Sequence, residues 1–212
     1  PGYEAHNPNV TKYAYDSARA RQLLTEAGFA PGPDGILRDR GGKRLEMTIM
    51  STAGNAIREQ VQQILREHLK AVGVDLRIDN RPAGVLFGQV TRRRTFPHMA
   101  MYNWNFNPLT LGPPLRHSDH IPAVANNREG QNVPGCRHAE NDRLLDQIAE
   151  ELDVTKRIQL LRRQQEIWAD EVPSIPLFHG LSLTTSKKTL RNVRPGVIGG
   201  ILFRSEGWEW AQ

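Results

Sequence analysis

The chain has 212 residues, of which 38% are hydrophobic and 24% charged, a balance typical of a globular core and unlike that of a disordered polypeptide. Its formal net charge is +5, with 28 basic residues interleaved among 23 acidic ones, which indicates a mildly basic, solvated surface and does not favour nucleic acid as a partner. The single cysteine, Cys136, excludes an internal disulfide and any metal site built from several thiolates.

Targeting and membrane-spanning segments are not found in the sequence. No charged start precedes a short apolar stretch, and no run of about 18 apolar residues occurs. The chain opens at Pro1 without a methionine, which suggests the interior of a longer protein. The lack of a leader in these residues therefore says nothing about the compartment.

The first predicted element is a short amphipathic helix. It begins after Asp16, whose side chain can cap the first turn, and ends at Gly28, which can adopt the left-handed conformation that stops a helix. The turn dipeptides Asp34-Gly35 and Gly41-Gly42 come next. They predict a hairpin that leads into a strand from Arg44 to Ser51.

The following segment predicts a strand–helix–strand unit. Apolar residues recur at helical spacing between Asn55 and Val72, and Gly73 ends this helix. From Val74 to Asn80 apolar and charged residues alternate, as in a half-buried strand. The two strands should be parallel, because the helix crosses over between them. The predicted inner face of the helix carries Ile57, Val61, Ile64, Leu65, Leu69 and Val72.

A weaker helix is predicted from Gly84 to Arg93, and a third strand in the stretch from His98 to Phe106. After Asn107 the chain becomes irregular up to Arg137, with many prolines, histidines and asparagines. Loops of this length are usually functional or lie over a surface.

Two amphipathic helices and a strand complete the predicted elements. The helices run from Glu140 to Leu152 and from Thr155 to Glu171. Pro173 and Pro176 bracket the strand, which continues through Leu181. The residues that the helix pair is predicted to bury are Leu144, Leu145, Ile148, Leu152, Ile158, Leu161, Ile167 and Trp168.

A metal site is one possible use of the histidine-rich loop at residues 117–120. His117, Asp119 and His120 lie together there, His138 follows further on, and imidazoles with a carboxylate can hold a metal. No further thiolate and no H-E-x-x-H helix supports such a site. Hydrogen bonding within the loop is the favoured interpretation, and no cofactor is predicted.

Nucleophilic catalysis is a second use of the same loop. Ser118 lies between histidines and Cys136 follows a glycine, so a Ser/His or Cys/His pair is conceivable. Neither residue occurs in a sharp strand-to-helix turn of the G-x-S-x-G type. A hydrolase or metal-dependent enzyme that uses residues 117–120 stays the alternative function, beside the favoured prediction of a protein that is not an enzyme.

The run Arg92–Arg94 is the one dense cluster of charge. It could neutralise a nucleic-acid backbone, but no aromatic platform is interleaved with it. A solvated surface is the favoured interpretation.

Aromatic and amide side chains alternate from Tyr102 to Asn107. Such residues suit a pocket that accepts the apolar body of a ligand and fixes its polar groups by a few hydrogen bonds. Trp104, Asn105 and Asn107 are therefore the candidate ligand-binding residues, with Tyr102 behind them. A core tryptophan at a strand end, beside turn-forming asparagines, is the open alternative.

Several blocks follow one another along the chain: the helix DSARARQLLTEAGF, the series from LEMTIMST to VDLRID, the tryptophan-bearing strand end, NNREGQN, the helix start ENDRLL and the segment EVPSIPLF. In this order they resemble the extracytoplasmic solute-binding proteins of peptide-type ABC importers, family 5, which include dipeptide, oligopeptide and nickel binders. Together they span most of the sequence. The resemblance implies an α/β fold, that of a periplasmic binding protein type II-like lobe, with a βαβ unit and a mixed sheet flanked by helices.

The resemblance also implies a function. Residues 1–188 would form the second, C-terminal lobe of a substrate-binding component, and residues 189–212 would return towards a missing first lobe. The intact protein would be a periplasmic or extracytoplasmic monomer whose signal peptide precedes Pro1. It would enclose a peptide-like or other small solute between its lobes by hinge closure and deliver it to a membrane permease.

One departure from the family pattern bears on the solute. Many peptide binders of this family place an aspartate just after the tryptophan, where its charge pairs with the ammonium group of the peptide. Here Trp104 is followed by Asn105, Phe106 and Asn107, and amides cannot neutralise a cation. We therefore expect an uncharged, glycan-like or blocked solute, or an anionic one.

Overall fold

The computed structural model describes residues 4–104, 113–180, 184–194, 196, 202 and 204–211. The chain divides into two compact units. The first consists of Pro1–Tyr102 and Pro113–Ser174, and the second of Asn103–Gly112 and Ile175–Gln212. The predicted boundary at residues 188 and 189 concerns an intact two-lobed protein and stays a prediction.

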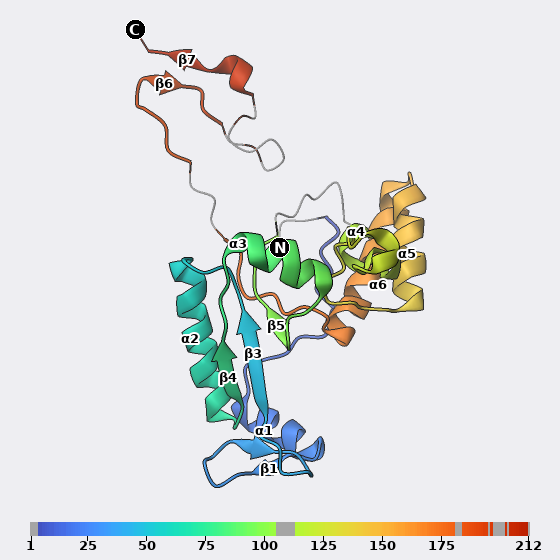
Figure 1. Ribbon diagram of the computed structural model, residues 1–212. Coiled ribbons are helices and arrows are strands. Elements are labelled where there is room, and N and C mark those ends of the chain that lie inside the picture. The colour runs from blue at the N-terminus through green and yellow to red at the C-terminus, as the bar shows by residue number, and fades with distance from the viewer. Residues whose placement is uncertain are drawn as a thin grey trace. The chain divides into compact units, whose positions relative to one another are not determined.

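A three-stranded parallel sheet lies at the centre of the first unit. The strand β3 (Glu46–Met50) pairs with β4 (Asp75–Ile78) on one side and with β5 (Met99–Ala100) on the other. The helix α2 (Ala56–Ala71) connects β3 to β4 and lies beside β4 in Figure 1. The α/β prediction and its parallel strand–helix–strand unit are confirmed, and the third strand is the two-residue β5.

Local signals set both ends of α2. The side chain of Asn55 accepts a hydrogen bond from the backbone N–H of Arg58 at 3.0 Å, which caps the first turn. At the other end Gly73 has φ +85°, and a Cβ at this position would lie 2.6 Å from Cγ of Leu37. Glycine is therefore required there both by the backbone conformation and by the packing.

The inner face of α2 differs from the prediction. Ile57 and Ile64 are 63% and 55% exposed, whereas Gln62 is fully buried. The Gln62 amide exchanges two hydrogen bonds with the side chain of Asn80, at 2.9 and 2.8 Å. Because both amide groups are paired, burying this polar residue does not leave unsatisfied donors or acceptors.

The N-terminal elements follow the predicted order. The helix α1 (Ser17–Glu26) is capped by the Asp16 side chain, as predicted. The strands β1 (Ala30–Pro31) and β2 (Leu37–Arg38) form a short antiparallel pair, and β3 follows within the predicted strand Arg44 to Ser51.

A single stretch of helix joins β4 to β5. It consists of α3 (Ala83–Val85) and η1 (Leu86–Thr91), wound as a π-helix, and confirms the helix predicted from Gly84 to Arg93. Leu86, the first residue of η1, is fully buried. The stretch ends where Arg94 adopts a left-handed conformation with φ +53°.

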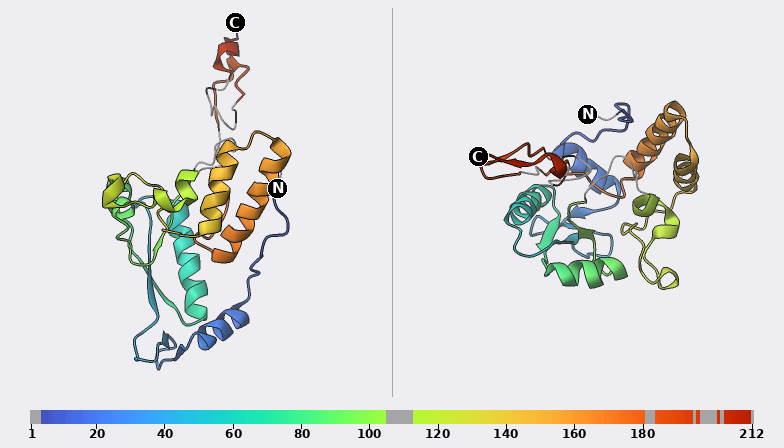
Figure 2. Two further views of the ribbon diagram at one scale, coloured as in Figure 1. Left: turned by 90° about the vertical axis from the view of Figure 1, so that its right-hand side faces the viewer. Right: turned by 90° about the horizontal axis from the view of Figure 1, so that it is seen from above.

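Helices form the remainder of the first unit. The elements are α4 (Pro113–Arg116), η2 (Ser118–His120), η3 (Val124–Asn126), α5 (Ala139–Glu150) and α6 (Val154–Glu171). Both views of Figure 2 show α5 and α6 side by side. Most of the predicted contact residues are buried, but Leu152 is 89% exposed because α5 ends two residues earlier. None of the helices in the described ranges is both long and apolar enough to cross a membrane.

The strand predicted around Pro173 and Pro176 is not formed in residues 172–180. Both prolines lack the N–H group that a sheet requires, and Val172, with φ +45°, turns the backbone at the end of α6. Leu181, the last residue of that prediction, lies outside the described residues.

The second unit contains a small antiparallel ribbon. Its strands are β6 (Leu190–Arg191) and β7 (Glu209–Trp210), and the short helix η4 (Ser205–Gly207) precedes β7. Within this unit Gly180 lies against Asn103, because a Cβ on Gly180 would be 3.3 Å from Asn103 Nδ2. Segments far apart in the sequence are thus neighbours here.

The substitution Gly130→Ala should destabilise the first unit. A Cβ at Gly130 would lie 2.0 Å from the carbonyl oxygen of His120, a backbone atom that cannot move aside like a side-chain tip. We expect the free energy of unfolding, measured by urea titration, to fall by about 1–3 kcal/mol. As a control, Gly88→Ala adds a Cβ with nothing within 4 Å and should leave stability unchanged or raise it by about 0.5 kcal/mol. Equal stability of the two variants would contradict the crowding at Gly130.

An ion-pair cluster between α5 and α6 should make stability depend on pH. Arg163 pairs with Glu140 at 2.8 Å and with Glu166 at 3.0 Å. The hydrogen bond from Arg163 is the main cause that lowers the pKa of each carboxyl from its ordinary value of 4.5.

A depressed folded-state pKa means that the stabilisation is present above pH 4.5 and is lost as the pH falls through the lowered values. In urea titrations, the difference in the free energy of unfolding between the natural chain and Arg163→Gln should therefore shrink as the pH is lowered below 4.5. A difference that stays constant over the same interval would show that the ion pairs contribute nothing.

Candidate functional site

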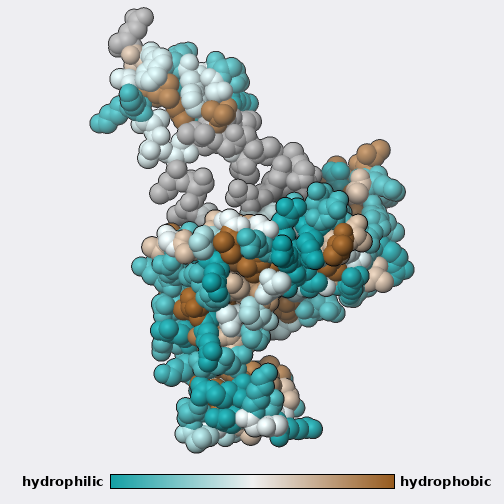
Figure 3. Space-filling model, viewed as in Figure 1, coloured by the Kyte–Doolittle hydropathy of each residue, from teal (hydrophilic) through white to brown (hydrophobic). Residues whose placement is uncertain are grey.

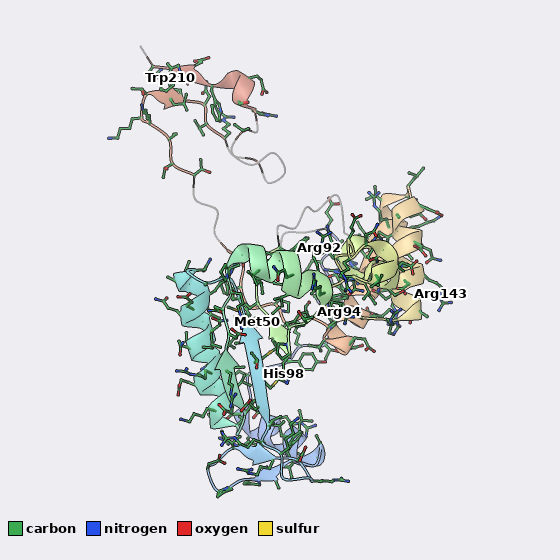
Figure 4. The ribbon with its side chains drawn as sticks, viewed as in Figure 1. Met50, Arg92, Arg94, His98, Arg143 and Trp210 are labelled. Atoms are coloured by element: carbon green, nitrogen blue, oxygen red, sulfur yellow. The ribbon has the colours of Figure 1, made fainter. Side chains whose placement is uncertain are left out.

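The carboxyl ends of β4, β3 and β5 lie at the same edge of the sheet, because all three strands are parallel. In open α/β sheets ligands bind outside this edge. The chain segments that leave it are Ser51–Gly54 after β3, Asp79–Arg81 after β4 and the residues from Met101 onward after β5. Figure 4 labels Met50 at the end of β3 and His98 before the start of β5.

Hydrogen bonds tie the ends of β3 and β5 together. Ser51 is fully buried, and its hydroxyl donates to the carbonyl oxygen of Met101 at 2.8 Å. The backbone N–H of Met101 donates to the carbonyl of Met50 at 2.7 Å. The backbone of the β5 end is therefore held beside that of the central strand.

The end of β4 is held in the same way. The Arg81 N–H donates to the Ser51 carbonyl, and the Ala53 N–H donates back to the Arg81 carbonyl, both at 2.9 Å. The guanidinium group of Arg58, on α2, donates to the hydroxyl of Thr52 at 2.6 Å. These bonds connect the edge segments to one another and to the helix α2.

Tyr102 lies at this edge. It is the last residue of Pro1–Tyr102, one of the two segments that make up the first unit. Its ring packs edge-on against Phe87, with 5.5 Å between the ring centroids. Burial raises the pKa of Tyr102. The residue combines an apolar ring with a polar tip.

The remaining candidate residues belong to the second unit. Trp104 is 49% exposed, so it is not the core tryptophan of the alternative interpretation. Asn105 and Asn107 lie outside the described residues. The ligand-binding role of Tyr102, Trp104, Asn105 and Asn107 remains a prediction.

A ring of hydrogen bonds at α4 was not predicted from the sequence. Arg116 Nη1 donates to Gln164 Oε1 at 2.8 Å, and the Gln164 amide donates to Asn141 Oδ1 at 3.0 Å. Asn141 Nδ2 closes the ring by donating to the Arg116 carbonyl at 3.0 Å. The Arg116 guanidinium also lies 4.9 Å from the centre of the Trp168 ring. Burial lowers the pKa of Arg116.

This ring fixes α4, which begins at Pro113. Gln164 and Asn141 are each 1% exposed, so every member depends on the others for its hydrogen bonds. No sequence pattern marks these residues, because their partners come from three separate helices.

The histidine-rich loop uses its side chains for internal hydrogen bonds. His117 Nδ1 accepts from the Asp119 N–H at 3.1 Å, and His117 Nε2 lies 3.5 Å from Asp146 Oδ1. His138 Nδ1 accepts from the Asn141 N–H at 3.2 Å and caps α5. Loop hydrogen bonding was the favoured prediction for these residues.

Asn132 connects the histidine-rich loop to the residues before α5, and its side chain is fully buried. Its Nδ2 donates to the carbonyls of His117 at 3.0 Å and Cys136 at 2.9 Å, and its Oδ1 accepts from the Gly135 and Cys136 N–H groups. Burial raises the pKa of the Cys136 thiol, with further contributions from nearby carboxylates, which disfavours the nucleophilic thiolate. Within the described ranges no group of three or more His, Cys, Asp or Glu side chains could hold a metal ion.

Known proteins resemble this chain over most of its length. The family described as bacterial extracellular solute-binding proteins, family 5 Middle, matches residues 1–120, more than half of the chain. The oligopeptide-binding protein AppA of Bacillus subtilis is 29% identical over 65% of this chain and 24% of its own length. The di/tripeptide-binding protein 2 of Pseudomonas aeruginosa is 25% identical over 89% of this chain and 33% of its own length.

One solved structure shares both sequence and fold with the chain. The oligopeptide-binding protein from Thermus thermophilus, in complex with a pentapeptide, is 34% identical, with a TM-score of 0.87. The match covers 99% of this chain and 38% of that protein. The chain thus spans well under half the length of the relatives it matches.

The substitution Gln164→Leu should strongly destabilise the first unit. It leaves Arg116 Nη1 and Asn141 Oδ1 without the partners they have in the ring, and we expect a loss of about 2–3 kcal/mol in the free energy of unfolding. The control is Gln159→Leu on the same helix, at an exposed position, with an expected change within about 0.5 kcal/mol. Similar urea midpoints for both variants would contradict a stabilising role for the ring.

Proposed function

The chain belongs to the bacterial extracellular solute-binding proteins, family 5, and from that membership we propose that it forms one lobe of the substrate-binding component of an ABC importer. The intact protein captures a small solute in a cleft between two lobes and delivers it to a membrane permease. The observation that carries this proposal is the sheet edge closed by hydrogen bonds around Ser51, which presents a rigid surface with Tyr102 beside it.

The share of the relatives that this chain spans supports the lobe assignment. The pentapeptide-bound relative matches 99% of the chain with 38% of its own length, which leaves room for a second lobe elsewhere in the protein. Residues 1–188 form the second lobe in this proposal, and residues 189–212 return towards the first. Closure of such a pair of lobes on a solute shifts the population to the closed form, because only that form contacts the solute from both sides.

The ligand contacts in the proposal are Trp104, Asn105 and Asn107, with Tyr102 behind them. These side chains offer aromatic faces and neutral hydrogen-bonding groups, with no carboxylate among them to pair with an ammonium group. The proposed solute is therefore uncharged, blocked at its amino end or anionic. The binding protein works outside the cytoplasm as a monomer, without a cofactor and without chemically changing its solute.

Isothermal titration calorimetry on the intact protein that contains this chain tests the proposal. The panel contains free peptides, N-acetylated peptides of the same sequence, and neutral and acidic oligosaccharides. We expect Trp104→Ala to weaken binding of the accepted solute at least about tenfold, since exposed aromatic side chains at binding sites often contribute more than about 1.4 kcal/mol. Tyr15→Ala, at another exposed aromatic residue, is the control and should leave affinity unchanged.

Three further outcomes decide separate parts of the proposal. The 212-residue chain alone should bind the solute weakly or not at all, because it holds one side of the cleft; micromolar affinity for this chain alone would contradict the two-lobe arrangement. If the panel returned only peptides with free amino groups, the proposed solute class would be wrong. Turnover of any panel compound would contradict a purely binding function.

A further inference from the structure

Two arginine side chains join the helix that ends at Arg94 to the loop before α5. Arg92 Nε donates to the Arg128 carbonyl at 3.2 Å, and Arg94 Nε donates to the Val133 carbonyl at 3.0 Å. Arg94 Nη2 donates to the Pro134 carbonyl at 3.1 Å. Figure 4 labels Arg92 and Arg94 at this end of the helix. These bonds bring together residues that are about 40 positions apart in the sequence.

Glycine makes the approach of Arg94 possible. A Cβ at Gly135 would lie 2.0 Å from Arg94 Nη2, so a side chain there would displace the guanidinium group. The residues Arg92, Arg93, Arg94, Arg128 and Arg137, which we call the arginine corner, thus come from both sides of this contact. Arg93 and Arg137 are exposed, as are Arg92 and Arg94, while Arg128 is half-buried.

Ion pairs are formed by other arginines but, among the described residues, not by those of the arginine corner. Elsewhere arginines pair with acidic side chains, as Arg44 does with Asp75 and Arg77 with Glu46. Within the described part of the chain, no arginine of the corner forms an ion pair. The carbonyl groups that hold Arg92 and Arg94 are neutral, so these hydrogen bonds bring no negative charge to the corner. The fold therefore adds Arg128 and Arg137 to the run of three arginines that is already present in the sequence.

We infer that the arginine corner is a docking surface for the anionic head groups of membrane phospholipids. Guanidinium groups bind phosphate oxygens through paired N–H donors, and clusters of basic side chains bind anionic bilayers by electrostatic attraction alone. A protein partner would instead call for buried aromatic or aliphatic anchors, and the corner itself consists only of arginines. The neighbouring Val124, which is 75% exposed, adds an apolar contact of the kind found on surfaces that lie against bilayers.

Figure 3 shows a mostly hydrophilic surface on this face of the first unit. The corner therefore fits attachment at the level of the head groups rather than insertion into the hydrocarbon core. Such attachment goes beyond solute binding, since it would hold the chain at the membrane whether or not a solute is bound.

Co-sedimentation with lipid vesicles tests this inference on the 212-residue chain. We expect binding to vesicles of phosphatidylcholine mixed with phosphatidylglycerol at low ionic strength, and no binding to phosphatidylcholine alone. At about 1 M salt, where the screening length is about 3 Å, binding should be lost. Arg93→Gln and Arg137→Gln should each weaken the partition coefficient about fivefold, the loss expected for one basic residue near an anionic surface.

Arg93 and Arg137 are chosen because neither side chain donates a hydrogen bond within the described ranges. Their variants should therefore fold normally. Arg19→Gln and Arg66→Gln remove the same charge at other exposed positions and should change the partition less than about twofold. Absence of binding at low salt, or equal losses in the control variants, would overturn the inference. Binding to poly-glutamate but not to the anionic vesicles would also overturn it and assign the corner to an acidic protein partner.

Discussion

The parallel pairing of β3 with strands on both sides is the constraint on which the candidate site depends. Because β3 is central, the segments after all three strands meet at one edge, where the Ser51 hydroxyl and the backbone groups of Arg81 and Met101 join them. These hydrogen bonds hold the edge segments to one another. A surface held in this way loses little conformational freedom when it makes a contact.

Buried polar side chains play the corresponding role in the helical part. The ring through Arg116, Gln164 and Asn141 joins three helices, and Asn132 satisfies the backbone of the loop that follows. Polar groups with all their hydrogen bonds made admit few alternative arrangements, since any shift leaves a buried group unpaired. His117 supports the same part of the chain, where its Nδ1 accepts a hydrogen bond from the Asp119 N–H.

The local elements were largely predictable from the sequence. Asp16, Asn55 and Asp153 each cap the helix that follows, and their effect depends only on residues within one turn. The errors concern burial and pairing. Ile57 and Ile64 have helical spacing yet are exposed, and the segment around Pro173 has an apolar pattern yet forms no strand in the described residues. Spacing identifies an apolar face but not what covers it.

The sequence by itself determined the α/β class, the parallel strand–helix–strand unit, most helix limits and, through its ordered motifs, the family, because these depend on short-range patterns along the chain. Only the tertiary structure decided that Gln62 and Gln164 are buried and that Arg94 meets the loop at Gly135. The hydrogen bonds of these three residues join positions 18 to 48 residues apart, and no local propensity encodes such a contact.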